Sequence, residues 1–155
     1  MKLNLLKSRF FWALATLLSP AAVFAADTFD AAKAENKTGV DLKDLNYAQA
    51  NGSTKSKSVT SANGIAFQIS DVNGDGFIDT IVVKEGKDEV TYRRLYPTAS
   101  NKTYGVNKQM SWKGEPYPIW EAARGGKALV IDMTSDDYAI ERRHHLRTAE
   151  TFFRN

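Results

Sequence analysis

The chain has 155 residues, no cysteine, 21 basic residues and 18 acidic residues. This length suits one domain of ordinary size, and the absence of cysteine excludes a fold held together by disulfide bonds. The three basic residues in excess, Lys2, Lys7 and Arg9, all lie in the first 25 positions, and removing them leaves 18 residues of each sign. The charge of the remaining chain therefore gives no signal for nucleic-acid binding.

The first 25 residues have the pattern of a cleaved secretory signal peptide. The basic start is followed by a nearly apolar run, Phe10–Leu18, then by Pro20 and by Val23-Phe24-Ala25. These last residues suit signal peptidase and predict cleavage after Ala25. The apolar run is too short for a bilayer core, which needs about 20 residues, and no second such run follows. We expect a periplasmic or secreted protein with no membrane span after signal removal.

Residues 26–57 are expected to be a polar, weakly structured N-terminal segment or linker. They are rich in Ala, Lys, Asn, Asp, Ser and Thr and contain few large apolar residues. Within them, Phe29–Asn36 has some helical character, Val40–Tyr47 is a candidate to dock on the domain, and Ala50–Lys57 is expected to be exposed.

A change of pattern near Ser58 predicts the start of the folded domain, residues 58–155. Asn63-Gly64 is a hairpin signal, and apolar residues at every second position from Ile65 to Ile69 predict a strand. Ile78–Val83 is β-branched and apolar and predicts a buried strand. Along the next strand, Val90, Tyr92 and Tyr96 are expected on one face and Thr91, Arg93 and Leu95 on the other.

The last third of the chain contains the expected helices. Tyr104–Trp112 is a weaker strand candidate, and Pro116 and Pro118 predict a short helix through Ala123 that ends at Gly125-Gly126. Ala128–Met133 predicts a strand. Thr134–Asp137 resembles a helix start, and the helix would run to Phe153, with a strand over Tyr138–Phe153 as the alternative. The expected fold class is α+β, a small antiparallel sheet with one or two helices toward the C-terminus.

Residues 71–79 carry the strongest chemical signal. Oxygen-bearing side chains fall at loop positions one, three, five and nine, Gly76 permits a sharp turn, and Phe77 offers a backbone carbonyl at position seven. Hard cations such as Ca²⁺ bind six to eight oxygen ligands. The sequence predicts one Ca²⁺ bound by Asp71, Asn73, Asp75, Phe77 and Asp79. The alternative is a plain turn, since Asn-Gly and Asp-Gly are good turn formers. Three Asp in nine residues would repel one another without a cation, which favours calcium.

The loop resembles two known calcium motifs. Its first positions match the start of an EF-hand loop, but position twelve is Val82, where an EF-hand has a bidentate Glu. With a strand expected on each side, Asp71–Asp79 is more similar to the strand–loop–strand motif of FG-GAP and VCBS-type repeats. This resemblance covers about 30 residues, at most Ile65 to Tyr96, and implies a calcium loop between two strands. Those repeats build β-propeller blades, and a single copy does not imply a propeller.

Other residues give weaker signals. Trp112, Tyr117 and Trp120 could form a platform for stacking on sugar rings, although Trp in a small domain more often belongs to the core. His144 and His145 are adjacent, which makes them poor partners for one metal, and we expect no catalytic role for either. Common nucleophile and phosphate-loop motifs are missing from the sequence, and no catalytic residue is predicted.

Three function classes follow from these observations. The first is an exported, non-enzymatic, calcium-binding module that binds a protein or cell-surface partner. The second is a carbohydrate-binding or adhesive module, and the third is a small periplasmic or secreted enzyme whose site is assembled from distant residues.

Overall fold

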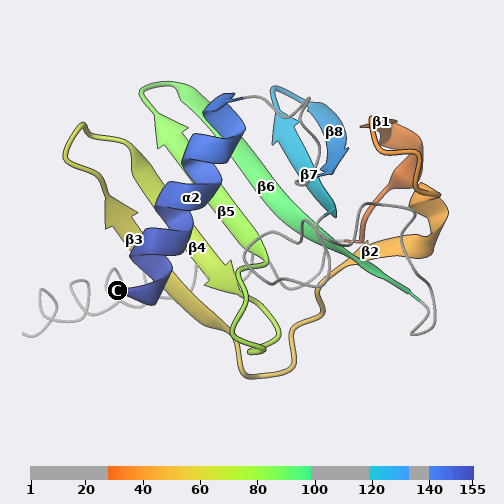
Figure 1. Ribbon diagram of the computed structural model, residues 1–155, viewed down its shortest axis with the longest axis horizontal. Helices are drawn as coiled ribbons and strands as arrows, with labels where there is room; N and C mark the ends of the chain where they lie inside the picture. Colours follow the sequence, from red (N-terminus) through yellow and green to blue (C-terminus); the bar gives the residue numbers. More distant parts are fainter. Residues whose placement is uncertain (1–27, 99–118, 133–139) are drawn as a thin grey trace, which may run out of the picture.

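The structure of the protein is a computed structural model, and it describes residues 28–98, 119–132 and 140–155. The predicted signal peptide, the strand over Tyr104–Trp112 and the helix start at Thr134–Asp137 lie outside these ranges. Within them the chain forms eight strands, two short 3-10 helices and one α-helix (Figure 1). In chain order these are η1 (Ala31–Lys33), β1 (Ala34–Asn36), η2 (Leu42–Asp44), β2 (Leu45–Tyr47), β3 (Lys55–Thr60), β4 (Ala66–Asp71), β5 (Thr80–Glu85), β6 (Asp88–Pro97), β7 (Ile119–Arg124), β8 (Lys127–Asp132) and α2 (Ile140–Arg154).

The strands form one open, mixed sheet in the order β1-β8-β7-β6-β5-β4-β3, and β2 pairs with β6 beside this path. The neighbours from β3 to β8 are antiparallel, as expected, whereas β1 is parallel to β8. The predicted hairpin at Asn63-Gly64 is confirmed. It joins β3 to β4, with Gly64 at a φ of 84° and paired backbone groups of Ser61 and Ile65.

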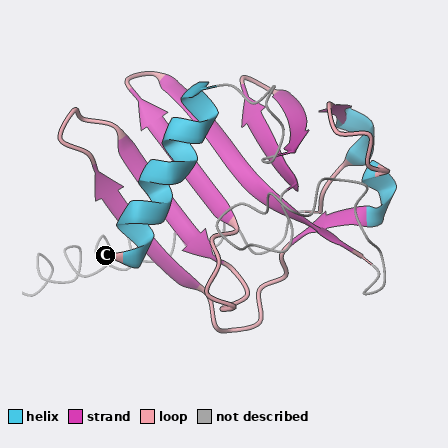
Figure 2. Ribbon diagram, viewed as in Figure 1, coloured by secondary structure: helices cyan, strands magenta, loops and turns pink. Residues whose placement is uncertain are grey.

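Helix α2 covers one face of the sheet, across β3 to β6 (Figure 2). Its residues Leu146 and Ala149, three positions apart, pack on the alternating side chains of the strands, among them Phe67 and Tyr92. Fully burying a side chain such as Leu or Phe stabilises a fold by about 1.5–3 kcal/mol, so this layer is the main core. The helix expected toward Phe153 is confirmed, and the strand alternative is wrong.

A second apolar cluster lies on the opposite face of the sheet. Leu95, Ile119 and Val130 point away from α2 because side chains alternate along each strand, and they are covered by residues from the N-terminal segment: Phe29, Leu42 and Leu45. The expected alternation of Tyr92 and Leu95 on β6 is thereby confirmed. Both faces of the sheet are covered near β6, β7 and β8.

The expectation of a weakly structured segment over residues 26–57 is wrong for its described part, and so is a domain start at Ser58. The few large apolar residues of this segment pack together in the second apolar cluster. In addition, β1 and β2 form hydrogen bonds with the sheet. Val40–Tyr47 does dock on the domain, while the helical character near Phe29 amounts to the single turn η1. Ala50–Ser56 is exposed, yet β3 already begins at Lys55.

The short helix expected to end at Ala123 is also wrong, since Ile119–Arg124 is strand β7. A short apolar run in a sequence is compatible both with a helix and with a strand that is buried on both faces. In the structure, β7 lies between β6 and β8, and both of its faces are covered. Gly125-Gly126 is not a helix end. Both glycines have positive φ, 57° and 79°, which is the conformation that a two-residue hairpin turn requires.

Candidate metal centre

The loop of interest joins β4 to β5 at one end of the sheet (Figure 1). Asp71 is the last residue of β4, and Asp79 directly precedes β5, so the two strands hold the ends of the loop together. Gly74 and Gly76 have φ values of 73° and 90°, in the left-handed region that glycine adopts without strain. The chain can therefore fold back within nine residues.

The structure brings the three aspartates of the motif together. One carboxylate oxygen from each of Asp71, Asp75 and Asp79 lies within 4.8 Å of the other two. Asp71 and Asp79 are buried, at 0% and 2% exposed, whereas Asp75 is exposed. A buried pair of carboxylates with a third on the solvent side is an arrangement that could hold a metal ion, because carboxylate oxygen is the ligand that hard cations prefer.

The backbone of the loop wraps around Asp71. Its Oδ1 accepts hydrogen bonds from the backbone N–H of Gly74 at 2.8 Å and of Asp75 at 3.2 Å, and its Oδ2 accepts one from Gly76 at 2.9 Å. These bonds fix the orientation of the Asp71 carboxylate. An ionised carboxylate has about four acceptor positions, so three N–H donors leave capacity for a cation.

Asp79 is held by one group of the loop and two side chains of β6. Its Oδ2 accepts the backbone N–H of Val72 at 2.8 Å, its Oδ1 accepts the hydroxyl of Tyr96, and Arg94 Nε lies 3.8 Å from Oδ1. Burial raises the pKa of Asp79 to about 6, while the two hydrogen bonds and the Arg94 charge act against this rise and the nearby Asp75 adds to it. A cation in the loop would act in the same direction as Arg94 and favour the ionised carboxylate.

Asn73 and Phe77 lie in the same loop, partly buried. The side-chain oxygen of Asn73 accepts the N–H of Asp75 at 3.2 Å, and a carboxylate oxygen of Asp75 accepts the N–H of Phe77 at 2.9 Å. Of the five predicted ligands, the three aspartates thus form the cluster of carboxylates. Asn73 and Phe77 contribute to the loop through these hydrogen bonds.

Sequence reasoning did not identify Arg94 and Tyr96 as neighbours of the loop. Arg94 is 1% exposed, donates from Nε and Nη2 to the carbonyl of Ile78, and stacks over the ring of Trp120 at 4.5 Å. The sequence contains one indication of the buried position of Arg94. The alternation of side chains along β6 puts Arg94 on the same face as Tyr92 and Tyr96. A charged residue on the core side of a strand indicates a buried partner.

The platform suggested for sugar binding is not supported at Trp120. This residue is 1% exposed and belongs to the core beneath α2, because it lies on the inner face of β7. Trp112 and Tyr117 lie outside the described residues. Of the two histidines, His144 is exposed, and His145 is buried with Nδ1 2.9 Å from the hydroxyl of Tyr92.

The chain matches no family model, and searches of curated proteins and of solved structures find no match. In the described residues, no helix has both the length and the apolar character needed to cross a membrane.

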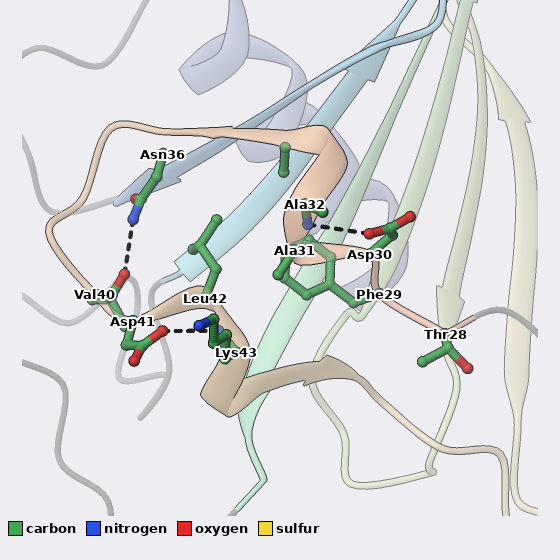
Figure 3. Close-up of a pocket in the computed structure, with 11 residues that line it drawn as sticks. Thr28, Phe29, Asp30, Ala31, Ala32, Asn36, Val40, Asp41, Leu42 and Lys43 are labelled. Carbon is green, nitrogen blue, oxygen red and sulfur yellow. Dashed lines mark hydrogen bonds between the residues drawn. The ribbon is translucent and has the colours of Figure 1, made fainter.

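A hollow of about 840 Å³ lies apart from the loop, between η1 and η2 (Figure 3). Its floor is apolar, with Phe29 and Leu42, and its polar groups serve local structure. Asp30 accepts the N–H of Ala32, Asp41 accepts that of Lys43, and Asn36 donates to the carbonyl of Val40. Asp30 and Asp41 therefore cap the two short helices, and Asn36 holds the connection between them. These side chains do not form a catalytic arrangement.

Proposed function

We propose that the protein is an exported, non-enzymatic module stabilised by one Ca²⁺ in the Asp71–Asp79 loop, and that it binds a protein or cell-surface partner. The observation that carries this proposal is the group of three carboxylates within 4.8 Å, two of them buried. Asp71, Asp75 and Asp79 are the proposed side-chain ligands. Asn73 would add its side-chain oxygen and Phe77 its backbone carbonyl, to approach the six to eight oxygens that Ca²⁺ takes.

Charge supports a divalent cation over a plain turn. Three ionised carboxylates face one buried guanidinium, that of Arg94, so two negative charges remain to be offset in a partly buried loop. Mg²⁺ is expected to compete poorly because it requires a small octahedral site, which a glycine-containing loop does not enforce. The absence of a Glu at position twelve predicts modest affinity, with a dissociation constant on the order of 10⁻⁵–10⁻³ M.

Export is the second element of the proposal. It is supported by the signal-peptide pattern of the first 25 residues, with release of a chain that begins at Ala26. A periplasmic or secreted location fits a structural calcium site of modest affinity, since extracellular calcium modules bind in the range of about 10⁻⁴–10⁻³ M.

A thermal melt in millimolar calcium and in chelator tests the calcium site. Binding to the folded state alone would stabilise it by about 2.7 kcal/mol at a hundredfold excess over the dissociation constant. Asp75→Ala should abolish this gain with little harm to the fold, because Asp75 is exposed. Glu85→Ala, which removes an exposed acid at the end of β5, is the matched control and should keep the gain. Equal melting temperatures of the unchanged protein in both conditions, without calorimetric binding, would refute the proposal.

A further inference from the structure

The segment Asn51–Thr54 lies against the entry half of the proposed calcium loop, at the same end of the sheet (Figure 1). Asn51 Nδ2 donates to the carbonyl of Asn73 at 2.7 Å, and Thr54 Oγ1 donates to the carbonyl of Val72, also at 2.7 Å. Two side chains from outside the motif therefore hold two successive carbonyls within it.

Close packing adds a third contact between the segment and the loop. A Cβ atom on Gly74 would lie 2.5 Å from Ser53 Cβ and 2.8 Å from the Ser53 carbonyl oxygen. Real Cβ atoms do not approach so closely, so glycine is needed here for the contact as well as for its φ of 73°. The loop can therefore lie this close to Ser53 only because residue 74 has no Cβ atom.

The segment itself is exposed, and core burial does not explain its position. Residues 51–54 are all exposed, and the side chain of Asn51 fixes their local turn by accepting the N–H of Ser53 at 3.0 Å. Directly after Thr54, β3 begins with Lys55, which lies opposite Asp71 across the sheet. Among the described strands, β3 pairs with β4 alone, so it is an edge strand. The segment thus leads into an edge strand whose first residue lies opposite Asp71, the first proposed ligand.

We propose that Asn51 and Thr54 are positioning residues of the calcium site, and that the bound ion in turn holds the Asn51–Thr54 segment and the start of β3 in place. This inference rests on the proposed function. Without a cation the three carboxylates repel one another, and the loop that carries the carbonyls of Val72 and Asn73 loosens. The segment then loses the acceptors of both its hydrogen bonds.

The coupling acts equally in both directions. If the ion favours the docked segment, then the docked segment favours the ion by the same factor, because binding free energies are reciprocal. Groups that orient metal ligands from outside the coordination sphere typically change metal affinity by about 10- to 100-fold. Loss of either hydrogen bond should therefore weaken calcium binding without touching a ligand side chain.

The test uses the purified protein, calcium chloride as the probe, and two readouts. Calorimetry gives the calcium affinity, and brief trypsin treatment with and without calcium gives the rate of cleavage after Lys55. Thr54→Val removes the hydroxyl donor at nearly constant shape, and Asn51→Ala removes the amide. Thr60→Val is the matched control, because Thr60 is exposed at the far end of the same strand.

The expected result is a loss of calcium affinity of about 10- to 100-fold in Thr54→Val and Asn51→Ala, with Thr60→Val unchanged. Calcium should slow cleavage after Lys55 in the unchanged protein and in the control, and much less in the two variants. Calcium binding that is unaltered in both variants, with cleavage that is equal with and without the ion, would overturn the inference while leaving the calcium site intact. No calcium binding by the unchanged protein would instead refute the proposed function.

Discussion

Arg94 Nε lies 3.8 Å from Asp79 Oδ1, and both side chains are 1% exposed. The same guanidinium donates twice to the carbonyl of Ile78 and stacks on Trp120, so it is anchored to the core and to the loop at once. A fixed positive charge therefore lies beside one of three clustered carboxylates. The protein offsets part of the charge of the loop from within its own core.

Replacing Arg94 by Met should destabilise the protein more in chelator than in calcium. In chelator, Asp79 becomes a buried carboxylate without its neighbouring cation, and breaking a buried ion pair costs about 3–5 kcal/mol. In millimolar calcium the bound ion offsets part of this loss. Urea unfolding in both conditions measures the difference. Arg93→Met is the control, because Arg93 lies on the other face of β6, over the ring of Tyr47 at 4.8 Å. Equal losses in both conditions would show that no cation replaces the Arg94 charge.

His145 should make the stability of the protein depend on pH. Burial lowers the pKa of His145, and the charges of His144 and Arg124 act in the same direction while Glu141 acts against them. The unfolded chain then takes up this proton more readily than the folded one. The contribution of His145 to stability is full above the unfolded pKa of about 6.5 and is lost as the pH falls below it.

Urea unfolding between pH 7.5 and 5 checks this in chelator, with His145→Gln as the test and His144→Gln as the control. The His145 variant should lose less stability on acidification than the unchanged protein, while the His144 variant should differ from the unchanged protein much less, because it removes only one contribution to the lowered pKa of His145. The comparison between variants is needed because the raised pKa of Asp79 contributes with the opposite sign. Identical pH profiles of the His145 variant and the unchanged protein would contradict the prediction.

Tyr47→Phe should loosen the N-terminal segment. The hydroxyl of Tyr47 donates to Glu121 Oε1 at 2.7 Å, and Glu121 is 7% exposed on β7. A hydrogen bond to a charged group contributes about 1.5–3 kcal/mol, and this variant leaves a buried carboxylate short of a donor. A double-mutant cycle with Glu121→Gln isolates the coupling between the two residues. Hydrogen exchange measures how strongly residues 28–47 are protected. Equal protection in the unchanged protein and in the variant would show that the Tyr47–Glu121 hydrogen bond does not anchor this segment.

The predicted signal peptide gives a direct mass test. The intact mass of the protein recovered from outside the cytoplasm should correspond to a chain that begins at Ala26. A product that retains Met1 in that fraction would exclude cleavage after Ala25.

The sequence predicted best where a pattern has one physical meaning. Alternation from Ile65 to Ile69 and the Asn63-Gly64 turn fixed the β3–β4 hairpin, and the spacing of the aspartates predicted that Asp71, Asp75 and Asp79 would meet. It predicted less well where long-range contacts decide the structure. The run from Ile119 to Ala123 is a strand because β6 and β8 lie on both sides of it, and no local feature reveals those neighbours.

The same limit applies to the surroundings of the candidate metal centre. Arg94 and Tyr96 reach Asp79 from β6, and Asn51 and Thr54 reach the loop from before β3. None of these four residues belongs to the nine-residue motif. Their closeness to the loop depends on contacts between distant parts of the chain, which the spacing of residues within the motif does not encode.

The parallel pairing of β1 with β8 has a consequence for the order of folding. Ala34 pairs with Ala128, so β1, the first of the described strands, finds its partner only when β8, the last of them, is available. Closing so long a loop carries an entropic cost, and contacts between distant parts of a chain slow folding. The hairpins from β3 to β6 need only near neighbours and can form earlier. The part of the N-terminal segment that forms β1 is therefore expected to join the sheet late in folding, after β8 has formed.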